Sequence, residues 1–125
     1  MQWLWIGMGG FLGANARYWL VRLVTKLTPT SLLPIGTMTV NILGCFAIGL
    51  AYGYSLQKEA NHYLHAFLLT GFLGGFTTFS SFGLEAFKLV GDHHNWLALW
   101  DMLNQVIVGF IAVALGYWLT QLRLN

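Results

Sequence analysis

The stretch GFLGGFTTFSSFGLE, residues Gly71–Glu85, decides how this chain is built. Three glycines and two threonines fall within its first eight residues, in the middle of a long apolar segment. Glycine and threonine are poor helix formers, so the cluster predicts a break in an otherwise helical segment. Inside a bilayer, a break is tolerated only where the exposed backbone lines a cavity or binds something. The alternative is an unbroken helix whose hydroxyl groups bond back to the preceding turn.

The composition around this stretch excludes most soluble classes of protein. Of 125 residues, 57% are apolar and 8% are charged, and the formal net charge is +2. An average soluble domain has roughly 25% charged residues. So few charges cannot cover a small soluble domain, disorder needs the opposite composition, and nucleic-acid binding needs a basic surface. The one cysteine, Cys45, excludes an intrachain disulfide. The composition therefore predicts an integral membrane protein.

Four stretches are long and apolar enough to cross a hydrocarbon core, which takes about 20 residues. They run from about Trp3 to Val24, Ile35 to Leu56, Tyr63 to Val90 and Trp96 to Leu122. The polar breaks between them are too short to hold a soluble domain. We therefore expect a single all-α transmembrane domain over residues 1–125, with four helices and the third one broken at mid-membrane.

The distribution of lysine and arginine gives little preference for one orientation in the membrane. With four spans, one side of the membrane carries Lys58 and Arg123, and the other carries Arg22, Lys26 and Lys88, with Arg17 if it reaches out. Orientation follows such a bias, and here the bias is nearly absent. This pattern favours insertion in both orientations and an antiparallel homodimer. The alternative is that a weak bias still selects one orientation.

Several glycines recur at a spacing of four residues: Gly9 and Gly13, Gly49 and Gly53, and Gly71 and Gly75. Small residues at this spacing let helix backbones approach closely in lipid. The pattern fits either packing between two chains or ordinary packing within one bundle.

Polar residues inside the spans are candidates for function, because they are costly in lipid. No carboxylate lies in the first, second or central fourth span, which argues against a proton-coupled exporter. All four histidines lie near span ends, and His93 and His94 lack a third metal ligand. No nucleophile and base come together, so we expect no enzyme.

Phe79 and Phe82 are three residues apart and so share one helical face. The edge of an aromatic ring is positive, so rings set edge-on can hold an anion without a trapping charge. Ser80 and Ser81 add hydroxyl donors, and Asn41 in the second span adds an amide donor. This set is typical of an anion pathway, although packing alone explains most aromatic stripes.

Three motifs occur in order along the chain: GGFLGANARY at Gly9–Tyr18, PIGTMTVNILGCF at Pro34–Phe46 and GFLGGFTTFSSF at Gly71–Phe82. With these motifs the chain resembles the Fluc (CrcB) fluoride channels of bacteria along essentially its full length. The resemblance implies a multi-pass protein of the bacterial inner membrane. It further implies an antiparallel, dual-topology homodimer with two pores that exports fluoride passively from the cytoplasm.

The resemblance also implies roles for particular residues. The pore would be lined by Asn41, the ring edges of Phe79 and Phe82, and the hydroxyls of Ser80 and Ser81. A structural sodium ion on the dimer axis would be bound by backbone carbonyls of Gly74 and Thr77. Arg17 and Glu85 correspond to residues near the vestibule or pore entry.

One feature departs from the family pattern, in which hydroxyl residues often continue along the fourth span. Val106–Gly116 has no serine or threonine, which leaves Asn104, Gln105, Tyr117 and Thr120 as donors on that span. Two other functions stay open. A small dual-topology multidrug-type exporter would need a glutamate in the first span, which this chain lacks. A non-conducting membrane assembly subunit would use its polar residues only for packing.

Overall fold

The computed structural model describes residues 1–57 and 61–124, and over these residues the chain is helical with no strand. The elements are α1 (Gln2–Leu27), α2 (Ile35–Gln57), α3 (His62–His65), the π-helical η1 (Ala66–Leu73), α4 (Gly74–Phe76), α5 (Phe79–Gly91) and α6 (Asn95–Leu124). The expected all-α class is confirmed. The polar break expected at Gln57–His62 lies partly outside the described residues.

Among the described residues, three helical stretches are long and apolar enough to cross a membrane: Ile35–Ser55, His62–Gly91 and Asn95–Arg123. They make the chain a multi-pass membrane protein. With 26 residues, α1 is also long enough, but it carries Asn15, Arg17 and Arg22 and is more polar than the other three. A fourth span therefore stays a prediction.

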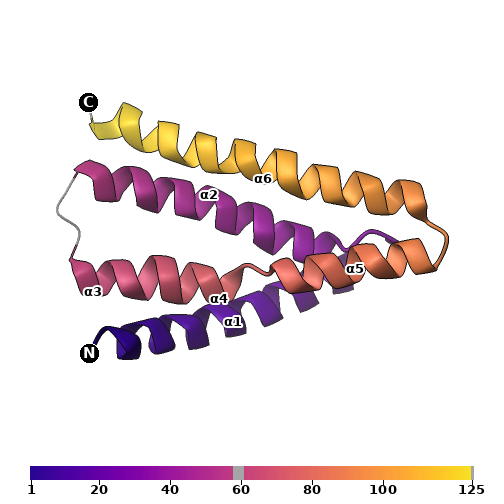
Figure 1. The fold of residues 1–125 in the computed structure, drawn as a ribbon, viewed down its shortest axis with the longest axis horizontal. Coiled ribbons are helices and arrows are strands. Elements are labelled where there is room, and N and C mark those ends of the chain that lie inside the picture. Colours follow the sequence, from indigo (N-terminus) through magenta and orange to yellow (C-terminus); the bar gives the residue numbers. More distant parts are fainter. Residues whose placement is uncertain (58–60, 125) are drawn as a thin grey trace.

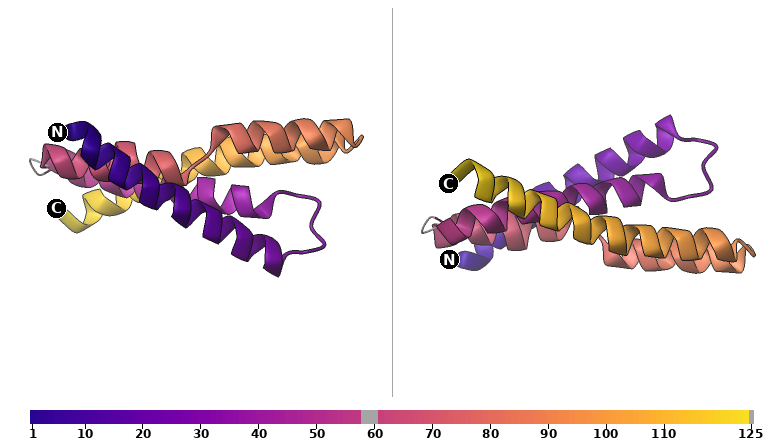
Figure 2. Two further views of the ribbon diagram at one scale, coloured as in Figure 1. Left: turned by 90° about the horizontal axis from the view of Figure 1, so that it is seen from below. Right: turned by 90° about the horizontal axis from the view of Figure 1, so that it is seen from above.

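The long helices pair side by side along the molecule (Figure 1). α2 lies along α6, and α1 lies along the stretch from α3 to α4. Both termini lie at one end of the molecule. At the opposite end the α1–α2 connection and the α5–α6 connection diverge, so that two pairs of helices splay apart (Figure 2).

The four-residue glycine pairs all pack helices within this one chain. A Cβ atom on Gly9 or Gly13 would overlap the backbone of η1, at the carbonyls of Phe67 and Phe72. From the other side, a Cβ on Gly75 would lie 2.7 Å from the carbonyl oxygen of Gly10. Gly49 and Gly53 meet α6 in the same way. These six glycines thus serve packing within the bundle, the plainer of the two expectations.

The third apolar stretch is broken, as its sequence predicts, but the break lies further along than the glycines. Thr77 and Thr78 have extended backbone, with φ −83°, ψ 160° and φ −150°, ψ 115°. Gly74, by contrast, is helical with φ −63° and ψ −35°. The break therefore lies at the threonine end of the predicted region: the helix continues through Gly74 to Phe76, and the backbone becomes extended only at Thr77 and Thr78, where Asn41 binds the Thr78 backbone.

Candidate functional site

Side chains from α1 and α2 satisfy the backbone groups that the break exposes. Asn41 accepts a 2.8 Å hydrogen bond from the Thr78 N–H through Oδ1 and donates from Nδ2 to the Thr78 carbonyl at 3.1 Å. Arg17 donates from Nη1 to the Thr77 carbonyl at 3.1 Å. Thr78 also begins α5 as its N-cap, because its hydroxyl accepts from the Ser81 N–H at 3.2 Å. The break is therefore a fixed feature held by hydrogen bonds.

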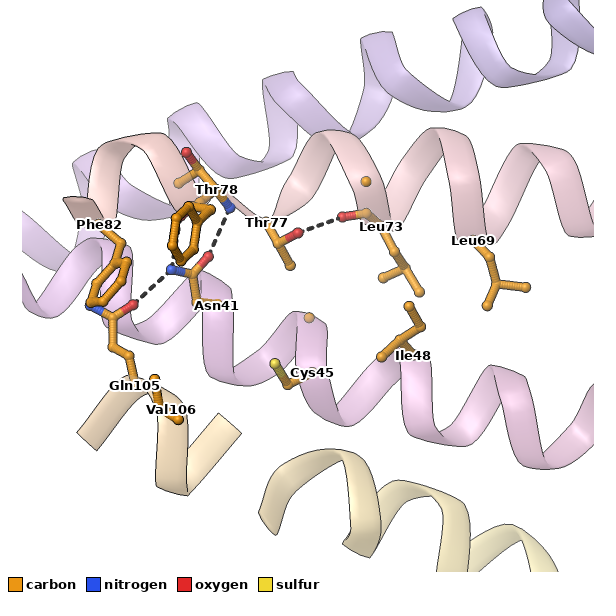
Figure 3. Close-up of a pocket in the computed structure, with 13 residues that line it drawn as sticks. Asn41, Cys45, Ile48, Leu69, Leu73, Thr77, Thr78, Phe82, Gln105 and Val106 are labelled. Atoms are coloured by element: carbon orange, nitrogen blue, oxygen red, sulfur yellow. Dashed lines mark hydrogen bonds between the residues drawn. The ribbon is translucent and has the colours of Figure 1, made fainter. Parts of the chain in front are cut away.

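A cavity of about 330 Å³ lies beside the break. Asn41, Phe82 and Gln105 lie at one end of it, and Ile48 and Leu69 lie at the other (Figure 3). The full lining consists of Asn41, Gly44, Cys45, Ile48, Leu69, Leu73, Gly74, Thr77, Thr78, Phe79, Phe82, Gln105 and Val106. The cavity thus has a polar end at the break and an apolar end toward the middle of α2.

The structure brings together Asn41, Phe79 and Phe82, three candidates from two separate motifs. The two rings have centroids 5.3 Å apart and planes tilted by 54°. Phe82 is 9% exposed, whereas Phe79 is 82% exposed in the single chain. The cavity is therefore bounded on the Phe82 side and open where Phe79 stands.

Ser80 and Ser81 do not line this cavity, but both lie within hydrogen-bond distance of the Thr78 hydroxyl, which does. The hydroxyl of Thr78 donates to the Ser81 Oγ at 3.0 Å, and its oxygen lies 3.4 Å from the Ser80 Oγ. Three hydroxyl groups therefore cluster on the first turn of α5, at the edge of the cavity.

The fourth apolar helix contributes a polar pair that sequence reasoning missed in part. Gln105 accepts from Asn41 Nδ2 at 2.7 Å through Oε1 and donates from Nε2 to Asp101 Oδ1 at 2.9 Å. Asp101 is fully buried, with 0% of its surface exposed. From its sequence position Gln105 was predicted only as a remaining donor on the fourth span, and Asp101 was not predicted. Their spacing of four residues on a helix was the available signal.

Glu85 lies away from the break, in contact with α2. Its Oε1 accepts from the buried Thr37 hydroxyl at 2.7 Å. It also lines a second cavity of about 330 Å³, which is bounded by the α1–α2 connection, by Lys88 of α5 and by Asp92 just after that helix. Arg17, the other candidate for a pore entry, is placed at the break itself by its bond to Thr77.

The carbonyls at the break have the chemistry of a site for a hard cation, because oxygen is the donor that such ions prefer. In an unbroken helix the Gly74 carbonyl would accept from the Thr78 N–H, but that N–H donates to Asn41. The Thr77 carbonyl is held in extended backbone and already accepts from Arg17. Gly74 therefore offers a freed oxygen, and Thr77 offers its second lone pair.

The chain matches known proteins along nearly its whole length. The family described as CrcB-like protein, Camphor Resistance (CrcB), matches residues 4–117. The fluoride-specific ion channel FluC of Helicobacter pylori strain P12 is 40% identical over 123 residues, which cover 94% of this chain and 92% of the relative. The protein of the same name from Solibacter usitatus is 43% identical over 117 residues, covering 93% and 95%. That from Azobacteroides pseudotrichonymphae is 42% identical over 119 residues, covering 93% of each.

Proposed function

The chain belongs to the CrcB family, and from that membership we propose that it is a fluoride-specific ion channel whose pathway runs through the cavity beside the break. As a channel it is not an enzyme. We further propose that it resides in the bacterial inner membrane and exports fluoride passively, down the ion's own gradient.

One observation carries this proposal: Asn41 of α2 lines the same cavity as Phe79 and Phe82 of α5. Two side-chain amides, two threonine hydroxyls and two aromatic rings line the cavity, and none of the described residues that line it is a lysine or an arginine. A conducting site must bind strongly enough to replace water and weakly enough to release the ion. Neutral donors and ring edges meet both conditions for a small, strongly hydrated anion.

The open side of the cavity supports the proposal of a homodimer. Phe79 lines the cavity and is 82% exposed, so one wall is incomplete in a single chain. A second copy packed there would cover the ring and close the pathway. The nearly balanced lysine and arginine distribution favours an antiparallel partner, and such a pair would hold two pores.

We also propose that a structural sodium ion binds at the dimer axis through the carbonyls of Gly74 and Thr77. One chain supplies only two such oxygens, so the site would be shared by both chains. The ion would supply positive charge that holds the two breaks together. The thermal unfolding temperature of the purified protein should therefore be higher in sodium than in N-methylglucamine, and equal temperatures would contradict the site.

Ion efflux from liposomes tests the proposed function against its two rivals. Purified protein in liposomes loaded with equal fluoride and chloride should release fluoride much faster than chloride, at a rate that rises with protein content. Transport of an organic cation instead would indicate a multidrug-type exporter. Release of neither ion, by protein shown to be a dimer, would indicate a non-conducting subunit.

A further inference from the structure

A relay of hydrogen bonds runs from three groups at the polar end of the cavity to Asp101 behind them, and the first group fixes its direction. The relay begins at the Thr78 N–H, which can only donate, so the Asn41 atom that faces it at 2.8 Å must be oxygen. The Asn41 nitrogen then faces the carbonyl of Gln105 at 2.7 Å. The Gln105 nitrogen in turn faces Asp101 at 2.9 Å. The orientation of both amides therefore follows from one backbone N–H.

The relay ends at Asp101, whose Oδ1 accepts from Gln105 Nε2. It is 0% exposed, and within the described residues its second oxygen, Oδ2, has no hydrogen-bond partner. A buried carboxyl group with an unpaired oxygen is costly, so its presence here needs a reason. The geometry offers one reason: Asp101 accepts a hydrogen bond from Gln105 and so fixes the orientation of the Gln105 amide.

The relay leaves Asn41 without a spare donor. Its two amide hydrogens go to the Thr78 carbonyl at 3.1 Å and to Gln105 Oε1 at 2.7 Å. The bond to Thr78 also stabilises the break, whereas the bond to Gln105 joins two side chains. An anion that reaches Asn41 must therefore displace the Gln105 carbonyl to obtain a hydrogen bond.

We propose that Asp101 is a positioning residue of the pore: by holding the Gln105 amide nitrogen, it keeps the Gln105 carbonyl on Asn41 as a competitor that the permeating ion has to displace. The inference rests on the proposed function. It makes the Asp101–Gln105 pair a control on how tightly fluoride binds, because releasing Gln105 frees the Asn41 donor.

Two uncharged replacements of Asp101 separate positioning from charge. Asp101→Asn keeps an oxygen that accepts from Gln105 and removes the charge, whereas Asp101→Leu removes both. We expect the fluoride concentration that half-saturates efflux to stay near the parent value in Asp101→Asn. In Asp101→Leu it should fall roughly fivefold, the effect of losing one competing neutral hydrogen bond. If Asp101→Leu does not assemble, Asp101→Ala takes its place.

The same comparison in a Gln105→Leu background shows whether Asp101 acts through Gln105. There the Asp101→Asn and Asp101→Leu variants should have equal half-saturating concentrations, because no Gln105 amide is left to hold. The inference would be overturned if the two variants still differ in half-saturating concentration without Gln105, or if they have equal values with Gln105 present. In either case, fluoride conduction by the parent would still support the proposed function. A parent protein that conducts no fluoride would overturn both.

Discussion

At the scale of single residues, the phenylalanine rings at positions 82 and 79 differ in how far they are buried. Phe82 is buried against the polar end of the cavity, and Phe79 stands exposed at its open side. Phe82→Ile keeps apolar bulk and removes the positive ring edge. We expect dimer-verified Phe82→Ile protein to lose about tenfold in fluoride efflux, and Phe79→Ile to behave likewise.

A neighbouring phenylalanine provides the control for this prediction. Phe87 lies on the same helix, is 75% exposed and does not line the cavity, so Phe87→Ile should conduct like the parent. If the rings only pack, Phe82→Ile should lower dimer stability with efflux per assembled channel unchanged. Near-normal efflux in Phe82→Ile would exclude the ring-edge mechanism here.

Asn41→Asp should be more damaging than either phenylalanine change. The added negative charge lies in the anion's path, where low polarity strengthens repulsion. The aspartate also cannot donate to the Thr78 carbonyl or to Gln105, as Asn41 does. We expect fluoride efflux below that of Phe82→Ile and a lower unfolding temperature, measured on the same preparations. Efflux above that of Phe82→Ile would contradict a place for Asn41 on the pathway.

The sequence identified some of these residues and not others for a physical reason. Asn41, Phe79 and Phe82 were recognisable because their side-chain types suit an anion and stand in motifs. The partnership of Asn41 with Gln105 joins residues 64 positions apart, and that with Thr78 joins residues 37 apart. Such pairings depend on how helices pack, so the sequence could have shown only the Asp101–Gln105 pair, four residues apart on one helix, and not its connection to Asn41.

At the scale of elements, composition predicted a break and tertiary hydrogen bonds placed it. Glycine and threonine weaken the helix over several residues alike, so propensity alone cannot choose the end point. Asn41 hydrogen-bonds both the N–H and the carbonyl of Thr78, and the Thr78 hydroxyl caps the N-terminus of α5. The break therefore lies at Thr77 and Thr78, while Gly74 stays helical.

The packing of α1 on the third stretch gives a prediction at this scale. A methyl group on Gly13 would overlap the Phe72 carbonyl and lie 2.9 Å from the Phe76 nitrogen, so the two helices would have to separate. We expect Gly13→Ala to lower the free energy of unfolding by about 1–3 kcal/mol. Gly7→Ala is the matched control on the same helix, because no other helix among the described residues lies within 4 Å of its added methyl. Thermal unfolding in detergent compares them, and equal stability would contradict this close packing.

At the scale of the whole molecule, composition alone predicted the all-α membrane class and the approximate position of the long helices, three of which are long and apolar enough to cross a membrane within the described residues. The four expected stretches, starting near Trp3, Ile35, Tyr63 and Trp96, correspond to α1, α2, the stretch from α3 to α5, and α6. Such spans are recognisable because a bilayer imposes one length and one composition on each. The close approach of α1 to η1 and of α2 to α6 depends on glycine contacts between helices, which no single span encodes.

The weak lysine and arginine bias predicts that the chain inserts in both orientations. Reporter proteins fused to the C-terminus, one active only in the cytoplasm and one only outside it, should both give signal. Adding lysines to a single loop should shift the ratio, because orientation follows this bias. A single orientation in every molecule would contradict the antiparallel dimer.

The central claim is that fluoride crosses the membrane through the cavity beside the break, and Cys45 allows a direct test. Cys45 lines this cavity and is the only cysteine in the sequence. A small methanethiosulfonate reagent attached there would fill part of a space of about 330 Å³. The measurement is fluoride efflux against the fraction of Cys45 labelled, determined by mass on the same sample, with Cys45→Ala protein as the control. We predict that efflux falls in proportion to labelling and that the control is unaffected; full labelling with undiminished efflux would contradict the pathway.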